Sequence, residues 1–169
     1  MNIETRVNPE KSHSNIERAT ANDLPSIQEL TNKLFEYEIE NGFDDNIESK
    51  WSFCAEGEKE LQDRITSKNS IGLVNKVDGK AVGYLIGLIR DEETGRLDAK
   101  YAELEHMFVS ENERGKGIGE ALVEAFKSWV KNNDLNKIKV NVSFDNKKAI
   151  EFYKKVGLAP ADVTMSGEI

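Results

Sequence analysis

Apolar residues recur along this chain with two different spacings, which predict helices and strands in one mixed α/β (α+β) fold. Helical spacing is clearest at 118–130, where the apolar residues fall on one face. Strand spacing is clearest at 138–142, where apolar and polar residues alternate. The whole pattern predicts strands at 16–20, 71–77, 81–89, 101–109, 138–142 and, weakly marked, 162–168, and helices at 24–39, 58–67, 118–130 and between Asp145 and Gly157.

Turn residues separate these elements at chemically sensible places. Asp78-Gly79 predicts a two-residue hairpin, because both residues tolerate positive φ. The strand after it, 81–89, is almost continuously apolar, which predicts a central strand buried on both faces. Residues 41–51 and 91–100 are polar and predict loops.

Length and charge limit the function classes. The chain has 169 residues and a formal net charge of −8. We expect a disordered N-terminal tail at 1–15, without a secretory signal, and a single domain at 16–169. The negative charge argues against binding to nucleic acid or to anionic membranes, and it suits a cationic small molecule. No apolar run reaches the roughly 20 residues that a membrane span needs.

Cysteine and histidine are too scarce to favour metal chemistry. Cys54 is the only cysteine, so an intramolecular disulfide is impossible, which favours a cytoplasmic location. His13 and His106 lie far apart, and His13 falls in the expected tail. We therefore predict no metal site.

The most informative segment is the glycine loop, which runs through Arg114, Gly115, Lys116, Gly117, Ile118 and Gly119. It lies between a strand and the strongest helix, where the first helical amides lack intrahelical partners and carry the positive end of the dipole. Glycines let a phosphate approach those amides, and the two basic residues add positive charge. The segment therefore predicts a pyrophosphate site.

Two common glycine loops do not match. A P-loop needs glycine at 110 and serine or threonine at 117, where this chain has Ser110 and Gly117. A dinucleotide fingerprint needs a third glycine at 120 or 122, where the chain has Glu120 and Leu122. The remaining pattern, Arg/Gln-x-x-Gly-x-Gly/Ala, is met from Arg114 onwards, and in this the chain resembles the GNAT acetyltransferase superfamily.

The resemblance extends from Ile16 over nearly the whole chain. The opening Ile16–Thr20, the strand Leu104–Val109 and a second signature on the last helix all match in the right order; that signature comprises Asn146, Ala149, Phe152, Tyr153, Lys155 and Gly157. The resemblance implies a mostly antiparallel central sheet flanked by helices, with two strands that splay apart at the cofactor site. It also implies acetyl-CoA as co-substrate and suggests a homodimer.

The resemblance assigns roles to residues at this cofactor site. Main-chain groups of Met107 and Val109, on either side of Phe108, would pair with the pantetheine arm, and the amides of Gly115–Gly119 would hold the pyrophosphate. Asn146, Ala149 and Tyr153 on the last helix would lie along the cofactor. Asn141 is a further candidate, and a solvent-facing strand residue is an equally good interpretation of it.

Catalysis at the acetyl group needs a base, because a primary ammonium with a pKa of about 10.4 is a poor nucleophile at pH 7. Glu103 and Glu105 share one face of the strand 101–109, and His106 is expected to point the other way. We favour Glu105 as base, with Glu103 as the alternative. Tyr153 would protonate the departing thiolate during direct transfer in a ternary complex.

The acceptor stays open at this stage. Residues 35–51 are strongly acidic, so they would draw a cationic small-molecule amine, although a solvated helix face explains them equally well. A protein lysine or N-terminus is an alternative acceptor. A noncatalytic acyl-CoA-binding regulatory domain is the remaining function class.

Overall fold

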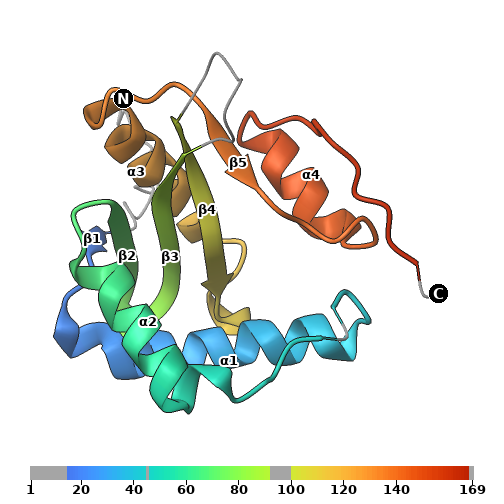
Figure 1. Cartoon of the computed structure of the whole chain (residues 1–169). Coiled ribbons are helices and arrows are strands. Elements are labelled where there is room, and N and C mark those ends of the chain that lie inside the picture. Colours follow the sequence, from blue (N-terminus) through green and yellow to red (C-terminus); the bar gives the residue numbers. More distant parts are fainter. Residues whose placement is uncertain (1–14, 45, 92–99, 168–169) are drawn as a thin grey trace, which may run out of the picture.

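The computed structural model describes residues 15–44, 46–91 and 100–167, and a sheet of five described strands forms its centre (Figure 1). The strands follow the order of the chain: β1 (Ile16–Arg18), β2 (Ser70–Val77), β3 (Lys80–Asp91), β4 (Lys100–Val109) and β5 (Ile138–Val140). The first four pair in antiparallel fashion, and β5 runs parallel to β4. The predicted mixed, mostly antiparallel sheet is confirmed.

Helices cover the sheet as the apolar pattern requires. On one face, α1 (Leu24–Glu40) and α2 (Ala55–Thr66) bury a core with Tyr84 and Ile86 of β3. On the other face, α3 (Ile118–Asn132) packs on Leu85 and Leu104, and α4 (Lys147–Lys155) lies beside β5 (Figure 1). Three single-turn 3₁₀ helices connect these elements: η1 (Ala21–Asp23), η2 (Trp51–Phe53) and η3 (Glu111–Glu113).

Two glycines of β3 let α3 approach the sheet closely. A Cβ at Gly87 would lie 2.2 Å from the ring of Phe126, and one at Gly83 would lie 3.0 Å from Ile118. Phe126 is fully buried at this contact. The glycines therefore fix the distance between the central strand and the helix that begins at the glycine loop.

Most predicted elements form with small changes at their ends, and the hairpin at Asp78-Gly79 has the expected positive φ at both residues. The final strand predicted at 162–168 is wrong as far as the structure describes it. Residues 161–167 form no strand, and Val163 and Met165 are 72% and 87% exposed. An alternating pattern makes a strand only where a neighbouring strand supplies hydrogen bonds. The expected tail, apart from Asn15, and most of the expected loop at 91–100 lie outside the described residues.

A β-bulge in β4 changes which face its side chains occupy. Ile86 pairs with His106, whereas the next residue of β3, Gly87, pairs with Leu104, so Glu105 is an extra residue without a partner. Residues that pair across strands point to the same face, so His106 lies with Ile86 on the α1 and α2 side. The expectation that His106 points away from the two glutamates is therefore wrong.

Strands β4 and β5 separate after a short paired stretch. Their register covers Ala102 with Ile138, Glu103 with Lys139, and Leu104 with Val140. β5 ends at Val140, whereas β4 continues to Val109. Residues 105–109 of β4 thus have no partner strand on the β5 side within the described chain, and the expected splayed strands are confirmed.

Candidate active site

The glycine loop occupies the turn between η3 and α3. Gly115 and Gly117 have φ values of 77° and 83°, and a Cβ on either would meet no atom within 4 Å. Gly117 is the N-cap of α3, and no side chain in the described part of the molecule caps this end. The first helical bond comes from the Ala121 amide to the Gly117 carbonyl at 3.0 Å. The turn therefore presents helix amides beside open space, as an anion site requires.

Gly119 has a different reason to be glycine. A Cβ there would lie 3.2 Å from the ring of Phe152 on α4. Lys155 of α4 also forms a 2.7 Å ion pair with Glu120 on the first turn of α3. These contacts hold the start of α3 and the end of α4 together at the edge of the glycine loop.

The two basic residues of the loop interact with the protein itself. Arg114 donates through Nε to the Val109 carbonyl at 3.0 Å, and its guanidinium carbon lies 5.1 Å from the ring centre of Phe108. Lys116 forms a 2.8 Å ion pair with Glu113. Arg114 thus fixes the end of β4 relative to the loop, and Lys116 remains on the exposed side.

Two of the predicted site residues, Asn146 and Tyr153, lie at the start of α4 and on its buried side. Asn146 caps the helix, because its Oδ1 accepts a 3.1 Å hydrogen bond from the Ala149 amide. Tyr153 packs against the core beneath α3, with its ring 5.3 Å from that of Phe152. Burial, together with the charge of Glu38, raises the pKa of Tyr153, so its hydroxyl stays protonated well above neutral pH.

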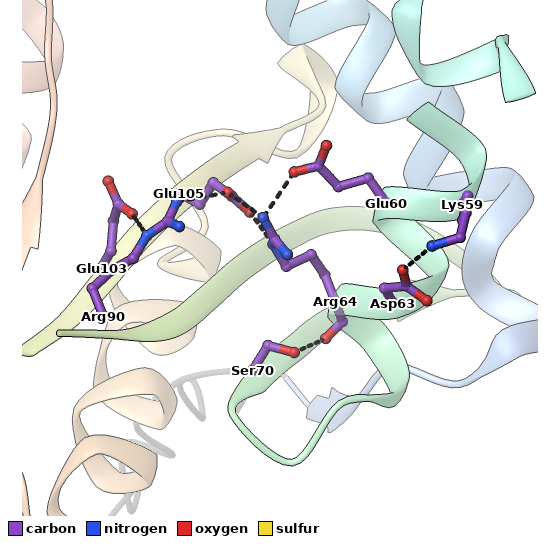
Figure 2. A network of polar contacts seen from close by, with 8 residues as sticks. All are labelled: Lys59, Glu60, Asp63, Arg64, Ser70, Arg90, Glu103 and Glu105. Atoms are coloured by element: carbon purple, nitrogen blue, oxygen red, sulfur yellow. Dashed lines mark hydrogen bonds and ion pairs between the residues drawn. The ribbon is translucent and has the colours of Figure 1, made fainter. Parts of the chain in front are cut away.

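A network of five charged residues surrounds the bulge on the α2 side: Glu60, Arg64, Arg90, Glu103 and Glu105 (Figure 2). Arg64 of α2 donates to both carboxylate oxygens of Glu105, with Nε–Oε2 at 2.8 Å and Nη2–Oε1 at 3.0 Å. Arg90 of β3 forms a 2.6 Å ion pair with Glu103 and lies 3.6 Å from Glu105. The two glutamates expected on one face are thus joined through Arg90.

The electrostatics of Glu105 follow from these contacts. Burial by itself would raise the pKa of Glu105, but the hydrogen bonds and charge of Arg64, with Arg90 and His106, lower it overall. Glu105 is therefore ionised at neutral pH. The Asn141 amide, which follows β5, lies 3.5 Å from Oε1 of Glu103 and thus faces the same network.

His106 lies in an aromatic setting next to this network. Its ring contacts Phe35 at 5.5 Å and Trp51 at 6.3 Å between centroids, both edge to face. Burial lowers the pKa of His106, so the imidazole is neutral at pH 7. Its buried Nδ1 has no hydrogen-bond partner among the residues that the structure describes.

Comparison with known families shows to which family the chain belongs. The family model described as "Acetyltransferase (GNAT) family" matches residues 26–158, which include the glycine loop, the bulged strand and α4. The chain belongs to the GNAT acetyltransferase family. The splayed strands and the open glycine loop are therefore features of a GNAT fold, as the resemblance of the sequence implied.

Curated GNAT relatives match part of the chain. An uncharacterised N-acetyltransferase of Methanocaldococcus jannaschii is 33% identical over 96 residues, which is 53% of this chain and 39% of that protein. The L-2,4-diaminobutyric acid acetyltransferase of Nocardia farcinica is 32% identical over 84 residues, covering 50% and 41%. The matches thus cover less than half the length of these relatives.

Solved structures share the GNAT fold over most of the chain. A mutant of the BH1408 protein of Bacillus halodurans has a TM-score of 0.80 at 22% identity, covering 92% of this chain and 99% of that one. The aminoglycoside N-acetyltransferase AAC(6')-Iy in complex with CoA has a TM-score of 0.73 at 18% identity, covering 96% and 99%. At these identities the similarity shows the fold alone.

Several residues of the site had no signal in the sequence. Arg64 is 41 positions from Glu105 in the chain, whereas its spacing from Glu60 is that of an ordinary i,i+4 helical pair. The bulged strand β4 has no glycine or proline that would mark the bulge at Glu105. Arg64 and Arg90 come from α2 and β3, and only the tertiary structure brings them to the two glutamates.

No cluster of histidine, cysteine and acidic residues in the described ranges could hold a metal ion. Likewise, none of the helices described is long and apolar enough to cross a membrane.

Proposed function

We propose that this GNAT protein is an N-acetyltransferase that moves the acetyl group of acetyl-CoA directly to a primary amine of a cationic small molecule. The proposal rests on two features that occur together in the described part of the chain: the N-terminus of α3 at Gly117 has no side-chain cap, and the edge of β4 at residues 105–109 has no partner strand on the β5 side. Together they suit an anionic head followed by an extended arm that forms strand-like hydrogen bonds.

The residues present fit coenzyme A. The amides of Gly115–Gly119 suit the pyrophosphate, because neither Gly115 nor Gly117 places a Cβ or a neighbouring atom in the way. The main-chain groups of Met107 and Val109, on either side of Phe108, suit the pantetheine arm along the free edge of β4. Asn146 and Ala149, at the start of α4, and Asn141 are proposed to line this arm.

The proposed reaction joins the amine nitrogen to the acetyl carbon and breaks the carbon–sulfur bond. We propose that Glu105 accepts the amine proton through a water, since both of its oxygens are engaged by Arg64. Its lowered pKa keeps the carboxylate ionised at neutral pH, which is the form that a base requires. Glu103, which is joined to Glu105 through Arg90, remains the alternative base.

Tyr153 is proposed to give its proton to the departing thiolate. Its raised pKa supports this role, because the hydroxyl remains protonated throughout the neutral range. A backbone amide near Met107, at the unpaired edge of β4, is proposed to stabilise the negative charge that develops on the carbonyl oxygen. No covalent acetyl-enzyme is needed, and Cys54 is the N-cap of α2, where its Sγ accepts a hydrogen bond from the Gly57 amide.

A small cationic amine is the acceptor that the charge of this chain supports best. The name of the Nocardia relative, a diaminobutyric acid acetyltransferase, and that of the aminoglycoside enzyme both describe amine acceptors. We further propose that residues 16–169 form one acetyltransferase domain that acts in the cytoplasm as a homodimer.

Free-thiol release from acetyl-CoA tests the proposal. The purified protein is incubated with acetyl-CoA and a panel of diamines, polyamines, aminoglycosides and a lysine-containing peptide. We expect turnover with at least one small cationic amine. Turnover with the peptide alone identifies a protein acetyltransferase, and tight CoA binding without turnover on any amine indicates a regulatory domain.

A further inference from the structure

Glu38, near the end of α1, is a half-buried carboxylate whose charge is not compensated. Its side chain forms no hydrogen bond or ion pair with any residue that the structure describes. The other half-buried glutamates in the described ranges are each paired with a cation: Glu60 and Glu105 with Arg64, Glu103 with Arg90, Glu113 with Lys116 and Glu120 with Lys155. Glu38 is therefore an exception that needs an explanation.

The helical repeat places Glu38 on the side of α1 that faces the sheet. It lies two turns after Thr31, whose hydroxyl bonds Tyr84 of β3 at 2.9 Å, and one turn after Leu34, which packs on the same core. α1 continues past β4 towards the side where α4 lies (Figure 1). The ring centre of Tyr37, the residue before Glu38, lies 5.8 Å from the guanidinium carbon of Arg114. Arg114 also donates to the Val109 carbonyl, so the end of α1 lies close to the end of β4.

The electrostatic partners of Glu38 agree with this position. Its negative charge acts on the hydroxyls of Tyr84 on β3 and Tyr153 on α4, which lie on different layers of the fold. Asp44, just after α1, adds a second negative charge next to it. Burial and Asp44 together raise the pKa of Glu38, which shows that the fold holds it at an energetic cost.

We propose that Glu38 binds the ammonium group of the acceptor beside Tyr153, and so selects a primary aliphatic ammonium over neutral and anionic acceptors. This inference rests on the proposed function and names the group that recognises the substrate. A cation at this place offsets the desolvation of the carboxylate and satisfies its oxygens with N–H donors. Asp44 strengthens the preference without contact.

The matched test compares Glu38→Gln with Glu40→Gln. Both variants remove one negative charge from the last turn of α1, but Glu40 is exposed. Spermidine, kanamycin and a lysine-containing peptide are titrated separately by calorimetry into each protein saturated with CoA, so that no turnover is required. We expect Glu38→Gln to weaken binding of at least one of these amines about tenfold or more, and Glu40→Gln to leave it within about twofold.

The controls separate this inference from the proposed function. CoA affinity should be the same for wild type and Glu38→Gln, and the unfolding temperature of the variant should be no lower, because the neutral amide removes the cost of burying the charge. Equal amine binding by the two variants, or no binding of any amine by the wild type, overturns the role of Glu38. If the wild type did not bind CoA, the proposed function would be overturned instead. The role of Glu38 would then be tested by titrating the amines into the protein without CoA. The titration that Glu38→Gln weakens, with spermidine or kanamycin or with the lysine-containing peptide, distinguishes a small-molecule acceptor from a protein lysine.

Discussion

Arg64 of α2 donates to both carboxylate oxygens of Glu105 on β4, at 2.8 and 3.0 Å, across 41 positions of the chain. The bulge makes this contact possible, because Glu105 has no partner on β3. The ion pair links α2 to the strand that carries both candidate bases, Glu103 and Glu105. It also sets the protonation state of the proposed base.

Arg64→Gln should shift the acid limb of the pH–rate profile to higher pH. Burial raises the pKa of Glu105 and Arg64 lowers it, so removal of the arginine leaves burial as the larger effect. The base is then protonated at a higher pH than in the wild type, and kcat/KM falls more at pH 6 than at pH 8.

Lys59→Gln is the control for this profile. Lys59 lies on the exposed side of α2 in a 2.8 Å pair with Asp63, so its loss removes the same charge from the same helix. Its profile should match that of the wild type. A parallel loss of rate for Arg64→Gln at every pH would contradict the role of Arg64 in the protonation of Glu105.

Gly117→Ala should weaken CoA binding by about tenfold or more, because the new Cβ occupies the space beside the α3 amides. The positive φ of Gly117 adds a stability cost of about 1 kcal/mol. Gly79→Ala is the control, because Gly79 has a φ of +79° and no neighbour within 4 Å but lies in the β2–β3 hairpin, outside the glycine loop. Calorimetry should show normal CoA affinity for Gly79→Ala, and equal affinity in both variants would argue against a pyrophosphate at the loop.

Tyr153→Phe should lower kcat by about 100-fold and leave the affinity for acetyl-CoA unchanged, because the ring remains and only the proton donor is lost. The raised pKa of Tyr153 also predicts that the alkaline limb of the wild-type profile does not come from this hydroxyl below about pH 10. Tyr101→Phe, at the start of β4 under Lys139, is the control. Unchanged kcat in Tyr153→Phe would leave the residue a packing role only.

Gly87→Ala should destabilise the fold by about 1–3 kcal/mol through overpacking, because its Cβ would lie 2.2 Å from the buried ring of Phe126. Thermal unfolding measures this as a lower Tm. Gly167→Ala, with no neighbour within 4 Å, should unfold like the wild type. An unchanged Tm in Gly87→Ala would show that α3 can move away from β3 without cost.

The sequence predicted those parts of the fold that local patterns specify. The apolar stripe of α3, the buried β3 and the turn at Asp78-Gly79 each depend on neighbours in the chain, and each is present. The final strand at 162–168 failed because its pairing depends on a sheet edge that no local pattern reveals.

The parts of the site formed by local backbone could be predicted from the sequence. The contacts between side chains that are distant in the sequence could not. The glycine loop was visible because helix amides and glycines define it locally. The position of His106 depends on one extra residue in the register of β4, and the alternation rule has no means to foresee it. The partnership of Arg64 with Glu105 and the isolation of Glu38 are properties of the packed structure.

Direct acetyl transfer is tested most directly by following a deuterated acetyl group from acetyl-CoA by mass spectrometry of both the amine and the protein. We predict that the label appears on the amine in step with free thiol and that none remains on the intact protein. The account would be contradicted if none of the amines tested acquired the label, or if the label remained on a protein side chain such as Cys54.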